Sequence, residues 1–426
     1  MAKVLIISSA FPPMKAGESD HCYRIGEQFL KRGLEVHILT RQGNGIKDGP
    51  PFRVHPIMPS WEWRDTLRLA REVRRLRPDA VLVLYIGWIY DEHPMMTFIP
   101  TLCKWAIPGV RVVTLFEYFS SWRPERWGRI TRLVRRAAEL LCGRERVDYS
   151  YGTLLRDSDA IVTLSGKHTN ALVSHDAAVT GKVSLVPPPP LLHMAEGPPD
   201  SIRAAARKEI GVQPDEFLIA YFGYIYPPKG VDTLMHALAL VHKENPRSKL
   251  ILIGGVIAQK YPDWPTYAED MKRLPGQLGI ERSVIWFGDY EAESDAPSRY
   301  LSASDACAFA HHHGIYLNNS SFAAAAAHGL PIIATRPQWV EAPFVDGHNI
   351  LFCEPNNPEA LADGLIRMAR DPALCARLGQ GARELAHQWY SWEVATLRLC
   401  QALGLSSAQA DRTRENGHSH RPMASE

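Results

Sequence analysis

The chain has 426 residues, of which 46% are hydrophobic and 22% are charged, and its formal net charge is +2. This composition is typical of a soluble globular protein, and the length exceeds what one hydrophobic core usually supports, so two domains are expected. A charge so close to balance gives no ground for predicting a nucleic-acid partner.

The cysteines and the apolar segments of the sequence indicate where in the cell the protein is found. The seven cysteines are scattered without a C-x-x-C pair, which favours a reducing compartment and gives no zinc signature. A first strand is already expected at residues 4–7 with no signal peptide before it. The longest apolar run, residues 80–90, is about half as long as a membrane-spanning helix. We therefore predict a cytoplasmic protein.

In the N-terminal half, short β-branched runs alternate with helical patterns. The runs are KVLIIS, EVHILT, AVLVLY, RVVTLF and AIVTLS, and residues 20–32 and 61–76 have helical spacing. This alternation predicts a parallel sheet with helices on both faces, and such sheets bind ligands at the carboxyl ends of their strands. The proline-containing loop at residues 8–20 follows the first of these ends.

A proline-rich segment then separates this series from a second one, and it suits neither a helix nor a central strand. The second series is FLIAYF, KLILIGG, VIWFG, ACAFA, PIIAT and NILF. The predicted fold class is therefore α/β, with two Rossmann-like doubly wound domains that face a central cleft. The expected parts are an N-terminal domain (1–188), a linker (189–200), a C-terminal domain (201–388), a final helix (389–405) and a disordered tail (406–426).

Residues 217–238, FLIAYFGYIYPPKGVDTLMHAL, are predicted to form a buried strand, a loop and a helix. Gly223 lets the backbone approach a ligand. Lys229 and Gly230 place an ammonium group and free amides at a helix N-terminus, where an anion such as a diphosphate is favoured. An ordinary strand-to-helix turn with a solvated lysine is the alternative.

A second helix start of this kind is predicted in residues 318–335, NNSSFAAAAAHGLPIIAT. Polar residues suited to an N-cap precede an alanine run of high helix propensity, then a glycine and a strand. Amides near Asn319, Ser320 and Ser321 are expected to stay unpaired and form a second anion site. A tightly packed core helix is the alternative reading. Two such starts in one half fit the two ends of a nucleotide diphosphate.

These pieces together resemble a GT-B glycosyltransferase of the retaining family 4 type over nearly all of residues 3–400. The matching segments are FPPMKAG, KRGLEV, FGYIYPPKGVDTLMHAL, KLILIGG, HGLPIIAT, VDGHNILFCEPNNPEALADGL and WYSWEVA. The resemblance implies a nucleotide diphosphate sugar bound to the C-terminal domain and an acceptor bound to the N-terminal domain. It also implies that residues 389–403 cross back to the N-terminal domain.

The resemblance assigns Gly17 to the neighbourhood of the donor phosphates, pairs Lys229 with them, and gives the distal phosphate to the amides of Ser320 and Ser321. Lys229 and the helix amides would stabilise the leaving diphosphate as a catalytic device, so neither a metal nor another cofactor is expected. Gly223 and Tyr224 complete this part of the predicted donor site.

The chain departs from the family pattern at two places. Tyr224 stands where the family has an arginine, which removes one phosphate-neutralising charge. Tyr316 and Ala324 stand where the family has a pair of glutamates that grip the sugar and the ribose. Glu341 is predicted as a further donor contact, because it begins the loop leading to DGHN.

The acceptor hydroxyl must be placed close to the anomeric carbon. Phe116 occupies the position where the family commonly has a histidine, so the adjacent Glu117 is predicted to be catalytic, with a capping or ion-pair role as the alternative. Asp91 and His93 follow the preceding strand at the same edge of the sheet and are predicted to bind the acceptor.

The run from His311 to His313 does not predict a metal site, because adjacent residues on a strand point to opposite faces. One of the three is expected to contact the donor sugar, and we predict that this residue is His313.

Two arginine-rich segments, residues 64–77 and 123–146, lie in the N-terminal half. Helical spacing places Leu133, Ala137, Leu140 and Leu141 on one face with arginines around it, the pattern of a basic amphipathic helix. Peripheral contact with an anionic membrane that carries a lipid-linked acceptor would suit this pattern. A solvated helix packed on the sheet is the alternative.

The predicted function is transfer of a hexose from a nucleotide diphosphate sugar to a saccharide or lipid-linked acceptor, with retention, in polysaccharide or glycolipid biosynthesis. The expected location is the cytoplasm, at the inner face of the membrane. The alternatives are a catalytically reduced GT-B-like partner subunit and a nucleotide-sugar epimerase.

Overall fold

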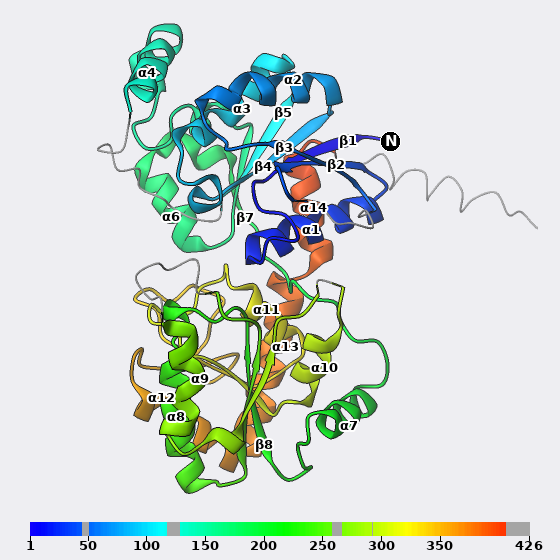
Figure 1. Ribbon diagram of the computed structural model, residues 1–426, viewed down its shortest axis with the longest axis vertical. Helices are drawn as coiled ribbons and strands as arrows, with labels where there is room; N and C mark the ends of the chain where they lie inside the picture. The colour runs from blue at the N-terminus through cyan, green and yellow to red at the C-terminus, as the bar shows by residue number, and fades with distance from the viewer. Residues whose placement is uncertain (45–50, 117–127, 258–265, 292, 406–426) are drawn as a thin grey trace, which may run out of the picture. The chain divides into compact units, whose positions relative to one another are not determined.

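The computed structural model describes residues 1–44, 51–116, 128–257, 266–291 and 293–405, which divide into two compact units (Figure 1). Unit 1 contains Met1–Leu164, His168–Val186 and the described residues from Glu393 onward. Unit 2 contains Ser165–Lys167 and Pro187–Trp392. Each unit is built on one parallel sheet, so the predicted α/β fold with two doubly wound domains is confirmed.

In unit 1, the described strands pair in the order β3-β2-β1-β4-β5-β6-β7. Their bounds are β1 (Lys3–Ile7), β2 (Glu35–Arg41), β3 (Arg53–Met58), β4 (Ala80–Tyr85), β5 (Arg111–Phe116), β6 (Ala160–Thr163) and β7 (Val183–Leu185). Every residue of β4 is buried, as expected of a central strand covered on both faces. The helices are α1 (Gly17–Lys31), α2 (Thr66–Leu76), α3 (Ile99–Ala106), α4 (Arg129–Cys142), α5 (Leu154–Asp157), α6 (Gly166–His175) and α14 (Trp392–Ala402).

In unit 2, the described strands pair in the order β10-β9-β8-β11-β12-β13. Their bounds are β8 (Phe217–Phe222), β9 (Ser248–Ile253), β10 (Val284–Gly288), β11 (Ala306–Phe309), β12 (Ile332–Thr335) and β13 (Leu351–Cys353). The helices are α7 (Pro199–Glu209), α8 (Val231–Glu244), α9 (Tyr267–Gln277), α10 (Ala296–Ala303), α11 (Ser320–Ala327), α12 (Pro358–Arg370) and α13 (Pro372–Trp389). The alanines of α11 from Ala323 to Ala326 are buried, because their small side chains let the helix lie close to the sheet.

Chain order reverses beside the first strand of each sheet. β1 lies between β2 and β4, and β8 lies between β9 and β11. The loops that leave the carboxyl ends of such neighbouring strands diverge to opposite faces, which opens a ligand crevice at this edge. The loops after β8 and β11 therefore define the edge of unit 2 where a site is expected.

The final helix packs on unit 1, although α13 immediately before it belongs to unit 2. Arg32 donates to the carbonyl oxygen of Glu393 (3.1 Å), Arg111 to that of Ala402 (2.5 Å), and Arg398 to that of Leu185 (3.0 Å).

Among the helices of the described residues, none combines the length and the apolar character that crossing a bilayer requires.

Candidate functional site

Two glycines shape the loop between β8 and α8. Gly223 has a φ of 128°, and a Cβ added to it would lie 2.7 Å from the hydroxyl oxygen of Ser321. Gly230 has a φ of 62°, and a Cβ there would lie 2.0 Å from the carbonyl oxygen of Ala310. Only glycine satisfies both the backbone conformation and the close approach. The loop after β8 thus contacts both the segment after β11 and the first turn of α11.

Lys229 lies in this loop, at the end of the 3-10 helix η7 (Pro227–Lys229), and is partly buried. Its Nζ atom is 5.4 Å from the centroid of the Tyr226 ring, over which it is held. The amide of His312 donates to the carbonyl oxygen of Pro228 (3.0 Å), which ties the lysine loop to the histidine run. An ammonium group fixed at this edge attracts an anion.

The histidine run separates into three different environments. His311 is buried beside Asn319, with 3.5 Å between its Nδ1 and the side-chain nitrogen of Asn319. Burial above all, and then the charges of Lys229 and His312, hold the pKa of His311 well below its usual value. His312 has its Nε2 4.0 Å from a carboxylate oxygen of Asp232, while His313, the predicted donor contact, is exposed. The structure therefore brings His311, rather than His313, next to the start of α11.

The first turn of α11 presents two amides. The side chain of Asn319 caps the helix by accepting from the amide of Phe322 (2.8 Å). The amide of Asn319 itself donates to the carbonyl oxygen of Tyr316 (3.1 Å), so the expectation of an unpaired amide at that residue is wrong. Within the described residues, the amides of Ser320 and Ser321 have no protein partner. These two amides, with the helix dipole behind them, are therefore available to an anionic ligand.

The three residues that depart from the family pattern each have a defined environment in the structure. Tyr224 is half-buried, and its carbonyl oxygen accepts from the hydroxyl of Tyr221 (2.8 Å). The ring of Tyr316 lies under the ammonium group of Lys167, 4.6 Å from its centroid. Ala324 is completely buried in α11, so it belongs to the packing of the helix and presents no polar group.

Glu341 is 1% exposed, and its carboxylate accepts hydrogen bonds from the amides of Leu317, Gly166 and Lys167. Burial raises the pKa of this carboxyl group, and the three amides act in the opposite direction. Its oxygens are thus occupied by backbone. We assign it as a positioning residue for the segment that leads into α11, in place of the predicted direct contact with the donor.

In unit 1, the first turn of α1 starts at Gly17, and a Cβ added there would have no atom within 4 Å. The preceding residue, Ala16, supplies no side-chain cap. The same turn carries Glu18 and Asp20, and Glu18 accepts from the indole nitrogen of Trp88 (2.7 Å). Two carboxylates at a helix N-terminus oppose a phosphate, so the role predicted for Gly17 has less local support than that of Lys229.

The predicted acceptor residues Asp91 and His93 lie after β4. Asp91 pairs with Arg41 (2.7 Å), and Arg41 also donates to the hydroxyl of Ser9 (3.1 Å), which gathers the ends of β1, β2 and β4. His93 begins the 3-10 helix η3 (Pro94–Phe98), where its Nδ1 accepts from the amide of Met95 (3.2 Å). Burial lowers the pKa of His93, so its ring is neutral near pH 7 and its Nε2 carries the proton.

Trp63, which sequence reasoning did not single out, connects His93 to α4. Its ring centroid is 5.6 Å from that of His93 and 5.4 Å from that of Phe98, and its indole nitrogen donates to Thr131 (2.8 Å). A cleft opens beside these residues. It is lined by Pro94, Thr97, Phe98, Thr131, Arg135, Val147, Asp148, Tyr149, Ser150 and Gly152.

The other acceptor candidate, Glu117, lies outside the described residues.

In the described ranges, no three histidine, cysteine, aspartate or glutamate side chains gather in a way that could hold a metal ion. That the reaction needs no metal remains a prediction, which rests on the ammonium group and the amides described above.

Comparison with known proteins relates the sequence of unit 2 to one family. Residues 202–385 match the family described as glycosyl transferases group 1. The matched region covers most of unit 2 and includes Lys229, the histidine run and α11. Over these residues, unit 2 is similar to glycosyl transferases group 1.

Curated proteins similar to this chain have D-inositol 3-phosphate glycosyltransferase as their name. The protein from Streptomyces bingchenggensis is 28% identical over 242 residues, 56% of this chain and 51% of the relative. The protein from Corynebacterium efficiens is 25% identical over 395 residues, 88% of this chain and 87% of the relative. The match thus spans about half the length of the first relative and most of the second.

Solved structures extend the likeness to both units. HepE from Anabaena in complex with UDP and glucose matches with a TM-score of 0.67 at 16% identity, over 95% of this chain and 100% of that chain. Sucrose-phosphate synthase from Thermosynechococcus elongatus matches with a TM-score of 0.67 at 17% identity, over 98% of this chain and 100% of that chain. The chain therefore has the two-domain GT-B fold.

Proposed function

We propose that this protein is a glycosyltransferase that moves a sugar from a nucleotide diphosphate sugar to a saccharide or lipid-linked acceptor. One observation carries the proposal: in unit 2, the Lys229 loop and the free amides of Ser320 and Ser321 meet through the contact between Gly223 and Ser321. A fixed cation and two amides at the carboxyl edge of a parallel sheet suit a diphosphate.

The same groups explain how the reaction would be promoted. The bond between the anomeric carbon and the diphosphate oxygen breaks, a bond to the acceptor hydroxyl oxygen forms, and the hydroxyl proton is released. Negative charge grows on the diphosphate during this step, and donors already in place stabilise it without reorganisation. Lys229 and the amides of α11 are such donors, so we propose that neither a metal nor another cofactor takes part. We also propose that the anomeric configuration is retained, as the family resemblance implies.

Similar proteins indicate which donors and acceptors to test first. The Anabaena neighbour has been solved with UDP, UDP and glucose, and UDP-glucose, which makes a uridine diphosphate sugar the first donor to test. The names of the curated relatives place D-inositol 3-phosphate in the acceptor panel beside saccharides and lipid-linked saccharides. For acceptor contacts we propose Asp91, the protonated Nε2 of His93, and Glu117.

The decisive experiment is a binding panel of nucleotide diphosphate sugars on the full-length protein, read by thermal shift and calorimetry, because a ligand of the native state raises its stability. UDP-glucose or another diphosphate sugar is expected to bind, and UMP to bind much more weakly because it lacks the second phosphate. If no diphosphate sugar binds, the proposal is wrong.

Turnover assays separate the rivals. Release of free nucleotide diphosphate together with a glycosylated acceptor supports transfer. Tight donor binding without turnover across the acceptor panel would favour a partner subunit. Conversion of the donor to an epimer with no acceptor present would identify an epimerase. For location, we propose the cytoplasm at the inner face of the membrane, where a lipid-linked acceptor would be encountered.

A further inference from the structure

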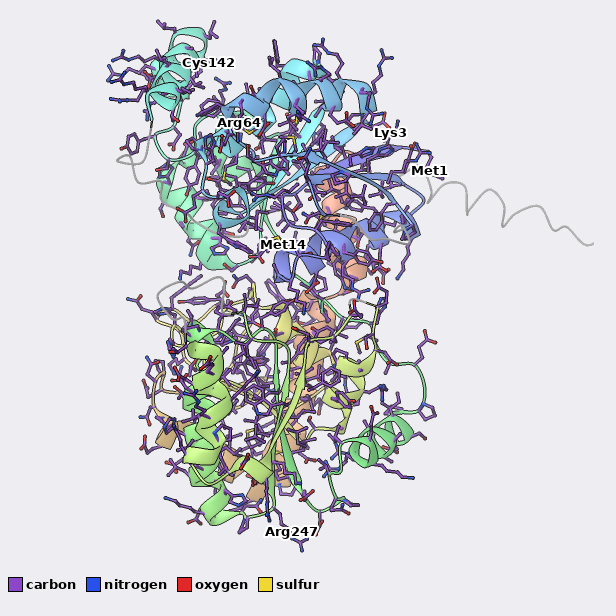
Figure 2. All side chains as sticks on the ribbon, in the orientation of Figure 1. Met1, Lys3, Met14, Arg64, Cys142 and Arg247 are labelled. Atoms are coloured by element: carbon purple, nitrogen blue, oxygen red, sulfur yellow. The ribbon has the colours of Figure 1, made fainter. Side chains whose placement is uncertain are left out.

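Helix α4 carries its large apolar side chains on the outside of unit 1. The exposed fractions are 62% for Ile130, 64% for Leu133, 88% for Leu140 and 86% for Leu141. Thr131 is the buried residue of this helix, held by the indole nitrogen of Trp63. The helix projects from the upper end of unit 1 in Figure 1, and Figure 2 shows side chains extending outward around the labelled Cys142.

The exposed side chains form one stripe with a basic border. At 100° per residue, positions 130, 133, 137, 140 and 141 fall within an arc of about 100°. Arg129, Arg132 and Arg136 lie along one side of that arc. Residues 128–146 contain six arginines and two glutamates, a net charge of +4. Isolated exposed leucines are ordinary, but a continuous aliphatic stripe flanked by like charges indicates a docking surface.

The other arginine-rich helix differs. In α2, the apolar side chains Leu69, Ala70, Val73 and Leu76 are buried in the core of unit 1. Two of its arginines also have partners in unit 1: Arg74 donates to the carbonyl oxygen of Ala106 (3.2 Å), and Arg75 pairs with Glu72. Of the two arginine-rich helices predicted to contact a membrane, only α4 therefore has an exposed apolar face.

We propose that α4 docks in the plane of an anionic lipid bilayer, with Leu140 and Leu141 among the acyl chains and Arg132 and Arg136 at the lipid phosphates. In-plane helices combine an apolar face with a cationic border in this way. An anionic leaflet attracts each nearby arginine, and salt screens that attraction.

Two other occupants fit the stripe less well. The tail at residues 406–426 contains no leucine, isoleucine, valine or aromatic residue, so its sequence offers nothing to cover four aliphatic side chains. A second copy that packed the same face against itself would bring two segments of net charge +4 together, and like charges oppose association. Anionic lipid is complementary to both the apolar stripe and its border.

Docking would also place a cleft at the lipid surface. Through Thr131 and Arg135, α4 lines the cleft that η3 and Tyr149 complete. η3 begins next to His93, a proposed acceptor contact. This consequence for a lipid-linked acceptor rests on the proposed function, whereas the docking itself stands on the exposed face of α4.

The test is cosedimentation of the full-length protein with vesicles of phosphatidylcholine alone or mixed with phosphatidylglycerol. We expect binding to the mixed vesicles that is at least about tenfold stronger than to neutral ones and that weakens with added salt. The double variant Leu140→Ser, Leu141→Ser should bind the mixed vesicles at least about tenfold less, because it removes the apolar surface that enters the bilayer. Circular dichroism checks that this surface change leaves the fold intact.

Leu67→Ser is the matched control, since Leu67 is 63% exposed on α2, close to the exposure of Leu133. It should leave vesicle binding unchanged. Equal vesicle binding by the double variant and the parent would overturn the proposal. So would a dimer of the parent, seen by sedimentation, that the double variant abolishes, because the face would then belong to a second copy. Measuring UDP-glucose binding in parallel separates a failure of docking from a failure of the proposed donor site.

Discussion

Gly230 and Ala310 meet backbone to backbone: a Cβ on the glycine would lie 2.0 Å from the carbonyl oxygen of the alanine. This contact holds the lysine loop after β8 against the segment that follows β11. The position of the ammonium group therefore depends on a residue that has no side chain.

Gly230→Ala should be strongly destabilising. An alanine in the left-handed region costs about 1–2 kcal/mol, and the steric overlap with Ala310 adds about 1–3 kcal/mol or displaces the loop. Gly211→Ala is the matched control, because Gly211 has a similar φ of 69° and open space around its Cβ position. Urea unfolding of the two variants compares them. Equal midpoints would show that the close contact does not constrain the loop.

Lys229→Met should lower the rate of sugar transfer by at least about tenfold, because 1.4 kcal/mol of leaving-group stabilisation corresponds to that factor. Lys243→Met, an exposed lysine at the other end of α8, should leave the rate unchanged. Initial rates of nucleotide diphosphate release measure both variants. A normal kcat in Lys229→Met would remove this lysine from the mechanism.

Glu341→Gln should destabilise the segment that leads into α11. The carboxylate accepts from three backbone amides, and the amide group of glutamine places a donor against at least one of them, at a cost of about 1–3 kcal/mol. We expect a lower unfolding midpoint and weaker donor binding. Glu354→Gln, at an exposed position, controls for loss of charge. If the two variants behave alike, Glu341 does not position the segment.

His21 should make the protein less stable in weak acid. It is 3% exposed, and burial lowers its pKa to about 4, whereas the unfolded chain has the ordinary value of 6.5. Because the unfolded state binds the proton first, this contribution to stability is complete above pH 6.5 and is lost as the pH falls toward 4. Between pH 6.5 and pH 5 the loss is about 2 kcal/mol. His21→Gln should show a correspondingly smaller drop in the free energy of unfolding over that interval, and an unchanged drop would contradict the assignment.

Treatment with EDTA should leave sugar transfer unchanged, since Lys229 and the amides of Ser320 and Ser321 supply the stabilisation that a metal would otherwise provide. The check is the initial rate after chelation and after subsequent addition of Mg²⁺ or Mn²⁺. Loss of activity that either ion restores would show that the two amides and the lysine are insufficient.

Local sequence pattern was enough to predict the elements of unit 2 that carry the proposed anion site. The run from Phe217 to Phe222 is a buried strand, and the polar residues before the alanine run cap α11. Such signals work because strand burial, helix capping and glycine conformations are decided by neighbours in the sequence.

Contacts between distant residues were not predictable in this way. Glu341 is buried because amides 24 and 175 residues away converge on it, which no local pattern records. The burial of His311 beside Asn319 was not predicted either, since β11 ends at Phe309 and the alternation of a strand does not apply to the loop beyond it. The stripe on α4 was visible as a pattern, but only the fold shows that unit 1 leaves it exposed.

The return of α14 to unit 1 has a consequence for biosynthesis. Arg32, Arg111 and Leu185 receive their partners on this helix only after the ribosome has translated the whole of unit 2. Unit 1 is therefore translated first but completed last, because the surface that α14 covers stays exposed in the nascent chain until that helix has been synthesised.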